Sequence, residues 1–476
     1  MFPPKSTFNL RSSPSIDFGP MSSVSVVRSQ SLFQITWPLF IDLALHFLTA
    51  ALNTFMISHV SYQAVAALSV GNQIFDVSIT LFNFVGIGSS VVITQYLGAG
   101  QRDVARKVVQ QAVGFNALIG LAVALGVLFG STYILQLMKM PQHLQAMGLT
   151  YLQIIALCLL PEAIALCLAA SLRAYGYTRE AMYVTGIVNL VTLLGNALLL
   201  YGWFGLPQMS VAGVACSTVI GRLVGVVLLL WLIRQRLGLQ LHWKDCCRFS
   251  TDIVRKIMKI GLPAAGENLS WMLQMMVITS FVALLGDKML ATQSYFFQIS
   301  LFVMLFGIAI GLGTEIMIGH LVGAGELDQA YHRLLRSLKI GLIVTVLSVV
   351  VVVLSGPHLM GLFTADAIIL ATAGHLFMLS LILEPGRTFN IIVISSLRAT
   401  GDARFPFRMG LLSMWGIAIP VAYLCGIHWG WGLVGVWCGF VVDEWVRGLT
   451  MFWRWRSRRW EKKVLVQRTT PANQAH

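Results

Sequence analysis

TWPLFIDLALHF at residues 36–47 and IGLPAAGENLSW at residues 260–271 each place a proline, and four residues later an acid, inside a long apolar stretch. The prolines Pro38 and Pro263 and the acids Asp42 and Glu267 are both separated by 225 positions (263 − 38 and 267 − 42). The same offset relates further identical residues or short segments: Ser69 and Ser294, Gln73 and Gln298, Gly86 and Gly311, Asp103 and Asp328, and Ser171–Ala174 and Ser396–Ala399. Many transporters are built from duplicated membrane units, so the repeat bears on function as well as on fold.

The composition predicts an integral membrane protein. The 476 residues are 57% hydrophobic and 11% charged, whereas soluble domains have roughly 25% charged residues. Twelve apolar runs long enough to cross the hydrocarbon core lie between about residues 33 and 453. We therefore expect an all-α membrane protein with twelve transmembrane helices.

The net charge of +14 does not indicate a nucleic-acid partner, because the basic residues are concentrated in every second loop. Arg102, Arg106 and Lys107 lie in one such loop, and the C-terminal region is also strongly basic. The alternate loops SHVSYQ at 58–63 and GIHWGW at 426–431 contain no Lys or Arg. This positive-inside bias predicts that both termini lie in the cytoplasm.

Six helices per half return the chain to the side on which it began. The halves should therefore form two parallel six-helix lobes, related by a pseudo-twofold axis along the membrane normal. We assign the chain as follows: 1–32, a disordered cytoplasmic tail; 33–236, the N-lobe; 237–253, a cytoplasmic linker; 254–456, the C-lobe; 457–476, a basic cytoplasmic tail.

Acids inside membrane helices are the first functional candidates, because a charge at the bilayer centre costs roughly 2.5–3.5 kcal/mol on insertion scales. Asp42 and Glu267 each follow a proline, which releases a backbone carbonyl nearby. A carboxylate beside free carbonyls suits a proton or Na⁺ site, and we predict that this pair couples transport to an ion. The structural alternative is a buried acid that is hydrogen-bonded to a neighbouring helix. Other acids in the apolar runs are Asp76, Glu162, Glu315 and Glu384.

Several other polar side chains are candidates to line an ion or substrate cavity, as is Glu162. His46 lies one turn after Asp42, where it suits a proton relay or a satisfied core position. Asn53 lies on nearly the same helix face. Gln73 and Gln298 are matched amides that either line a cavity or join helices.

The remaining candidates differ between the two halves. Glu315 aligns with Ser90 and is a candidate second cation ligand. Glu384 and Arg387, three residues apart, most simply form a buried pair, with cavity lining as the alternative. Trp271, one turn after Glu267, would stack on flat or cationic substrates if it faced inward, and would otherwise be a packing residue.

Enzyme signatures are absent from the sequence. It has no Walker A motif, no H-E-x-x-H and no nucleophile elbow, and the Gly-x-Gly at 311–313 lies inside an apolar helix. We predict a non-enzyme without cofactors. An ion gradient is then the energy source, unless a separate ATPase chain supplies it.

Three sets of motifs resemble the multidrug and toxic compound extrusion (MATE) family, in its NorM-like bacterial branch. They are the GAG-x-x-D segments LGAGQRDVARK and VGAGELDQAYH, the paired LRAYG and LRATG, and the helix openings PQMSVAGVA and GLVGVWCG. The resemblance covers residues 33–455. It implies a V-shaped pair of six-helix lobes in a bacterial inner membrane that exports organic, often cationic compounds in exchange for Na⁺ or H⁺, as a monomer.

The family's coupling acids do not transfer directly to this chain. The resemblance implies acids at the positions of Asn53, Trp271 and Arg387. Acids stand instead at Asp42, Glu267 and Glu384, so we predict that Asp42 and Glu267 take over the coupling.

The main prediction is a multidrug or metabolite antiporter for cationic or zwitterionic aromatic compounds, with H⁺ or Na⁺ as the coupling ion and membrane lipids around it. One alternative is a flippase for lipid-linked precursors, which would need a basic cavity for phosphates. Another is a non-transporting membrane scaffold, which would not explain why the acid recurs in the repeat.

Overall fold

The computed structural model describes residues 30–58, 62–201, 208–246 and 248–466, and these fold almost wholly into helices. Residues 1–29 of the predicted tail at 1–32, and the last ten residues, 467–476, lie outside the described residues. The first half forms α2 (Leu32–Ser58), α3 (Tyr62–Gly98), α4 (Arg102–Leu137), α5 (Gln142–Ala174), α6 (Thr178–Tyr201) and α7 (Ser210–Leu237).

The second half repeats this order. Its helices are α9 (Thr251–Leu284), α10 (Asp287–Gly323), α11 (Leu327–Gly361), α12 (Ala367–Ala399) and α15 (Gly432–Arg456). Between α12 and α15 one continuous segment consists of α13 (Arg404–Ser413), η2 (Met414–Ala418), α14 (Ile419–Tyr423) and η3 (Leu424–His428). Short helices α8 (Trp243–Cys246) and η4 (Arg459–Lys463) follow α7 and α15.

The described residues thus contain twelve long helical segments, as the sequence predicts, and ten of them are apolar and long enough to cross a membrane. The other two, α9 and α15, carry charged side chains within their length, including Glu267 on α9 and Asp443 on α15. The predicted all-α, twelve-helix architecture is confirmed.

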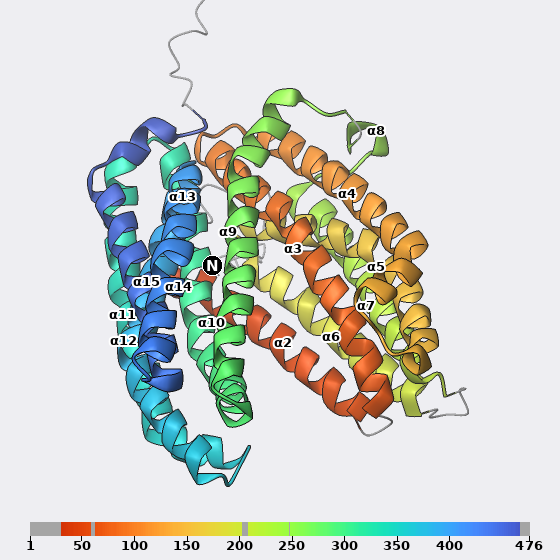
Figure 1. The fold of residues 1–476 in the computed structure, drawn as a ribbon. Helices are drawn as coiled ribbons and strands as arrows, with labels where there is room; N and C mark the ends of the chain where they lie inside the picture. The colour runs from red at the N-terminus through yellow and green to blue at the C-terminus, as the bar shows by residue number, and fades with distance from the viewer. Residues whose placement is uncertain (1–29, 59–61, 202–207, 247, 467–476) are drawn as a thin grey trace, which may run out of the picture.

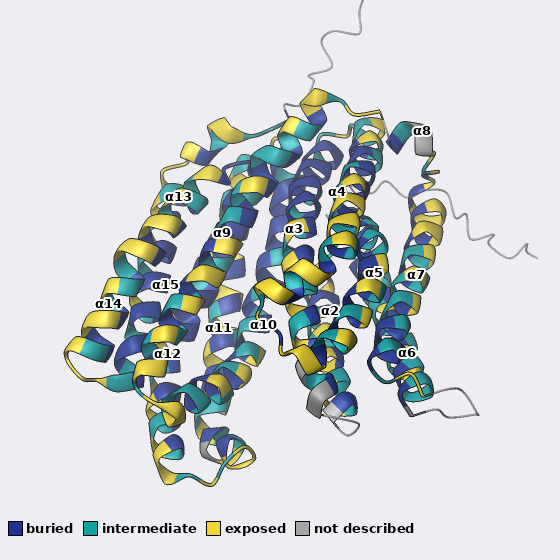
Figure 2. Ribbon diagram, turned by 45° about the vertical axis from the view of Figure 1, so that its right-hand side comes forward, coloured by how far each residue is buried: buried dark blue, intermediate teal, exposed yellow. Residues whose placement is uncertain are grey.

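Figure 1 shows the helices in two groups, α2–α7 on one side and α9–α15 on the other, which we call the N-lobe and the C-lobe. Large apolar side chains cover the outside, as with Phe129 on α4 and Leu354 on α11, and Figure 2 shows the exposed residues on the outer faces of the helices. An apolar outer surface is the opposite of what a soluble protein presents, and it suits a lipid environment.

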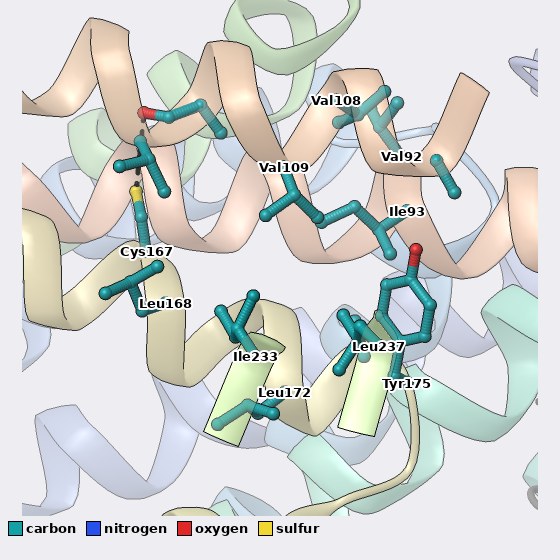
Figure 3. Packing of buried hydrophobic residues seen from close by; sticks show 14 of the residues in the cluster. Val92, Ile93, Val108, Val109, Cys167, Leu168, Leu172, Tyr175, Ile233 and Leu237 are labelled. Carbon is teal, nitrogen blue, oxygen red and sulfur yellow. Dashed lines mark hydrogen bonds between the residues drawn. The ribbon is translucent and has the colours of Figure 1, made fainter. Parts of the chain in front are cut away.

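Each lobe has an apolar core built mainly from its own helices, although Ile257 of α9 also packs in the N-lobe core and Ile35 of α2 in the C-lobe core. In the N-lobe, Val92 and Ile93 of α3 meet Val109 of α4, Leu172 of α5 and Ile233 of α7 (Figure 3). Small residues allow closer approach elsewhere: a Cβ added to Gly120 on α4 would overlap Ala163 on α5. Such small-residue contacts are the usual way in which membrane helices pack closely.

The two lobes approach each other closely beside the turns Gly98–Gly100 and Gly323–Gly325, and we call this the GAG end. The last glycine of each turn, Gly100 or Gly325, has a positive φ of 78° or 77°, which other residues rarely adopt. Away from this end the two groups of helices diverge in Figure 1.

Two pseudo-symmetric hydrogen bonds cross between the lobes at the GAG end. Gln95 of α3 donates from Nε2 to the carbonyl oxygen of Ala399 in the C-lobe at 2.7 Å. His320 of α10, 225 positions after Gln95, has Nε2 at 2.8 Å from the carbonyl oxygen of Ala174 in the N-lobe. Because both partners obey the same offset, the internal repeat also builds the contact between the lobes.

The backbones of α3 and α10 also approach each other closely at the GAG end. A Cβ added to Gly98 would overlap the carbonyl oxygen of His320, and one added to Gly323 would overlap that of Gln95. Deeper in the interface, Phe40 of α2 stacks on Phe306 of α10 with ring centroids 4.2 Å apart.

We expect Gly323→Ala to destabilise the protein, because the new methyl group meets a backbone oxygen that cannot rotate away. Overpacking of this kind costs roughly 1–3 kcal/mol. Gly126→Ala is the matched control, since Gly126 is also helical and has nothing within 4 Å of an added Cβ. Thermal unfolding in detergent should show a lower Tm for Gly323→Ala only; equal Tm values would contradict the close crossing.

Candidate functional site

The two repeated acids are each paired with an arginine from the other repeated motif. Arg173 Nη1 lies 3.2 Å from Asp42 Oδ2 in the N-lobe. Arg398 Nη2 lies 2.7 Å from Glu267 Oε2 in the C-lobe. Arg173 and Arg398 are themselves 225 positions apart, so the repeat encodes the whole ion pair and not only the acid.

The local structure explains how these side chains meet. Asp42 lies one turn after Pro38 on α2, and Arg173 lies in the last turn of α5 near the GAG end. Both Asp42 and Glu267 are buried, and Arg173 and Arg398 are largely buried. Removing the charge of one partner from a buried ion pair strongly destabilises the protein, because the other charge is then left uncompensated.

A second pair lies beside the first in the N-lobe. Arg222 Nε on α7 lies 3.1 Å from Glu162 Oε2 on α5. Glu162 follows Pro161, which lies inside α5. The guanidinium of Arg222 also lies 6.0 Å from the ring centroid of Phe75, within cation–π range.

In the C-lobe, the positions that correspond to Glu162 and Arg222 are both arginines, Arg387 and Arg447. Their charges are therefore balanced by acids at other positions of the repeat. Arg387 Nη1 lies 2.8 Å from Glu384 Oε1, so the sequence-predicted pair is present. Arg447 Nη2 lies 3.1 Å from Asp443 and 3.3 Å from Glu444, and its Nη1 lies 3.7 Å from Glu267. The C-lobe thus has one continuous charged network, in which Glu267 takes part.

A cavity of about 390 Å³ lies where the N-lobe faces α10, and we call it the inter-lobe cavity. The N-lobe contributes His46 and the two ion pairs Asp42–Arg173 and Glu162–Arg222. The C-lobe contributes Glu315, together with Leu312 and Ile316. Ser90, the repeat counterpart of Glu315, lines the same cavity.

A second space of about 340 Å³ lies within the N-lobe, and we call it the N-lobe cavity. His46 and Arg222 line both cavities. The rest of the N-lobe cavity is lined by aliphatic side chains and by a few polar or aromatic ones, among them Asn53, Asn72, Phe75, Asp76 and Tyr151.

Two amide hydrogen bonds shape its wall. Asn196 donates from Nδ2 to Asn53 Oδ1 at 2.7 Å, and the Tyr151 hydroxyl donates to Asn72 Oδ1 at 2.6 Å. Asp76, by contrast, is exposed to the cavity and has no ion-pair partner in the described part of the chain.

The structure therefore divides the predicted site residues into three groups. Those around the two cavities are Asp42, His46, Asn53, Glu162 and Glu315. Those in the C-lobe network are Glu267, Glu384 and Arg387. The side chains that line neither cavity are the exposed Gln73 and Gln298 and the half-buried Trp271.

Sequence reasoning missed the arginines Arg173, Arg398 and Arg222 as partners of the membrane acids. The 131-residue spacing shared by Asp42–Arg173 and Glu267–Arg398 was the available signal. Among the described residues, no group of three or more His, Cys, Asp or Glu side chains could hold a metal ion.

Comparison with known proteins gives consistent results for sequence and fold. The MatE family model matches residues 38–198 and 263–424, and the two matches begin 225 positions apart. "Uncharacterized transporter YisQ" of Bacillus subtilis (strain 168) is 41% identical over 439 residues, which cover 92% of this chain and 96% of that protein.

More distant relatives agree. "Probable multidrug resistance protein NorM" of Thermotoga maritima is 23% identical, with 94% of this chain and 96% of that protein covered. Among solved structures, "Crystal structure of MATE in the bent conformation" superposes with a TM-score of 0.85 at 17% identity, covering 92% of this chain and 98% of that chain. An outward-facing multidrug resistance MATE family transporter has a TM-score of 0.84 at 17% identity, with the same coverages of 92% and 98%.

We expect Arg173→Gln to destabilise the protein by about 3–5 kcal/mol, because it leaves the buried carboxylate of Asp42 without its cation. The double variant Asp42→Asn, Arg173→Gln removes both charges and should recover much of that loss. Tm values of the two single variants and the double variant in detergent test this pairing. Strictly additive Tm losses would contradict it.

Proposed function

This chain belongs to the MATE family of transporters, and we propose that it is a secondary active antiporter that exports organic cations or zwitterions in exchange for protons. One observation carries the proposal: the inter-lobe cavity contains Asp42 of one lobe, which is paired with an arginine, and Glu315 of the other, which has no ion-pair partner within 4 Å among the described residues. Multidrug resistance proteins among its relatives support export as the direction of transport.

The N-lobe cavity supports cationic substrates. Arg222 in its wall is held by Glu162, so its positive charge is already balanced. Asp76 is not balanced by any described arginine or lysine and remains available to a ligand. The rings of Phe75 and Tyr151 add aromatic surface near it. A flat organic ammonium compound would satisfy both features.

The acid–arginine pairs support proton coupling. A proton on Asp42 removes the charge that holds Arg173, which then lines the inter-lobe cavity without its partner. His46, one turn from Asp42 and in contact with both cavities, suits the transfer of that proton. Because the same cavity is also lined by Glu315 of α10, the release of Arg173 would link protonation in the N-lobe to a rearrangement at the boundary between the lobes.

Protons suit this arrangement better than Na⁺. Hard cations bind through several oxygen ligands at once. Asp42 and Glu267 instead each face an arginine, whose charge opposes a bound cation. We accordingly propose H⁺ as the coupling ion, with Asp42 as the coupling acid of the N-lobe and Glu267 as that of the C-lobe.

The basic residues near the GAG end support a cytoplasmic location for that end and for both termini, in a bacterial inner membrane. A flippase for phosphate-bearing lipids is less well supported, because each arginine that lines the N-lobe or inter-lobe cavity is paired with an acid. A cavity for phosphates would need unbalanced arginines.

Asp42→Asn should abolish proton-driven transport, because an amide holds no exchangeable carboxyl proton. In proteoliposomes, ethidium movement driven by an imposed pH gradient should fall at least about tenfold for Asp42→Asn and for Glu267→Gln, the loss expected for a coupling group worth about 1.4 kcal/mol or more. Asp103→Asn, an exposed acid at the GAG end, is the control and should retain the wild-type rate.

An imposed Na⁺ gradient without a pH gradient should drive no transport. Full-rate transport by both acid variants, or transport driven by Na⁺ alone, would contradict the proposed coupling.

Asp76→Asn should weaken binding of a permanently cationic substrate by roughly 10- to 100-fold, since a hydrogen bond to a charged group is worth about 1.5–3 kcal/mol. Asp76→Glu keeps the charge and should lose far less. The KM for ethidium export and the KM for an uncharged aromatic substrate measure the effect separately. Equal losses for the two substrates would show that Asp76 does not recognise the cation.

A further inference from the structure

The residues after α15 bridge the two lobes instead of leaving the surface. Ser457–Val466 first pack against the C-lobe. Trp460 is fully buried, stacks on Trp455 with ring centroids 4.4 Å apart, and donates its indole N–H to the Trp455 carbonyl oxygen at 2.9 Å. Gly401, between α12 and α13, lies so close that an added Cβ would approach the Lys463 carbonyl oxygen at 2.5 Å.

The same segment then crosses to the N-lobe. The Leu465 backbone N–H donates to Gln95 Oε1 on α3 at 3.0 Å. Val466 is 5% exposed and belongs to the N-lobe apolar core that contains Leu97 and Ile233. Ten residues therefore join the core of one lobe to the core of the other.

Gln95 connects this segment to the contact between the lobes. Its amide is fully buried, and each end has one partner: Nε2 donates to the Ala399 carbonyl oxygen, and Oε1 accepts from Leu465. A buried amide that loses either partner is left with an unsatisfied polar atom, which costs more than the bond itself contributes. The segment and the interface at the GAG end therefore stabilise each other.

The other half of the repeat differs. Its chain also continues past the last helix of the lobe, through Gly238 in the left-handed conformation, and Leu239 is buried in the same N-lobe core as Leu237. Residues 238–241 stay with the lobe from which they come, and the chain passes to the C-lobe only further on, at α9. The crossing by 457–466 is therefore an asymmetric addition to a symmetric interface.

We propose that residues 457–466 form a strap that holds the lobes together at the GAG end and must detach before that end opens. This proposal rests on the proposed antiport function, which requires the GAG end to open during transport, and it adds a step that regulates that opening. Opening at the GAG end separates Gln95 from Ala399 and removes Val466 from the N-lobe core, so the strength of the strap sets the fraction of molecules that are open there.

The test measures opening directly in the full chain. Spin labels are placed at Asp103 and Gln329, exposed positions near the two GAG turns, in a background without the native cysteines. Pulsed electron–electron distance measurements in lipid nanodiscs then give the fractions of open and closed molecules without any substrate.

Val466→Asp, which places a charge in the N-lobe core, should raise the ratio of open to closed molecules by roughly five- to thirty-fold. Leu465→Pro removes the backbone donor to Gln95 together with the apolar side chain of Leu465, which packs beside Gly401, and should act in the same direction. It serves as the test variant if Val466→Asp fails to fold. Lys462→Asp is the control, since Lys462 is an exposed residue of the same segment; its distances should match the wild type.

Unchanged distances in both strap variants, or an equal shift in Lys462→Asp, would overturn the strap. Failure of the wild-type chain to transport ethidium would contradict the proposed function instead, because the distance measurement needs no transport.

Discussion

A carboxylate inside a bilayer must either pair with a cation or give up its charge, and this constraint governs the interior of both lobes. The cost of an unpaired charge explains why Asp42 and Glu267, which lie in apolar helices, are each held by an arginine. It also explains why a proton has a large effect there. Neutralising either acid leaves its arginine as the group without a partner, and the structure must rearrange to provide one.

The rearrangement is directed by what differs between the halves. The acid, its arginine and the hydrogen bonds at the GAG end are repeated with one offset, so by themselves they favour neither lobe. Glu315 faces the N-lobe across the inter-lobe cavity, whereas its counterpart Ser90 offers no charge. The strap is likewise present once. The repeated residues thus build the fold of both lobes, whereas Glu315 and the strap make the two lobes differ.

The sequence was sufficient for the fold, because a 225-residue repeat and apolar runs of membrane length depend only on local patterns. It was insufficient for the partners of the acids. Arg173 ends α5 among basic loop residues, and its sequence context indicates a cytoplasmic loop, but its long side chain reaches back to Asp42. Trp271 and Gln298 illustrate the opposite case: their positions suggest a cavity, but helix orientation places them away from the two cavities described. The C-terminal segment is basic at its surface, and only the three-dimensional structure shows Trp460 and Val466 inside.

In this mechanism a proton on Asp42 replaces Arg173 as the partner of that carboxylate. Infrared difference spectroscopy in lipid, recorded while the pH is stepped across neutrality, detects the carbonyl stretch of a protonated carboxyl group directly. If Asp42 takes up the proton, a band of this kind appears on acidification in the wild-type protein and is missing in Asp42→Asn. The mechanism is contradicted if the same band persists in Asp42→Asn, or if no carboxyl band develops while transport still responds to the pH gradient.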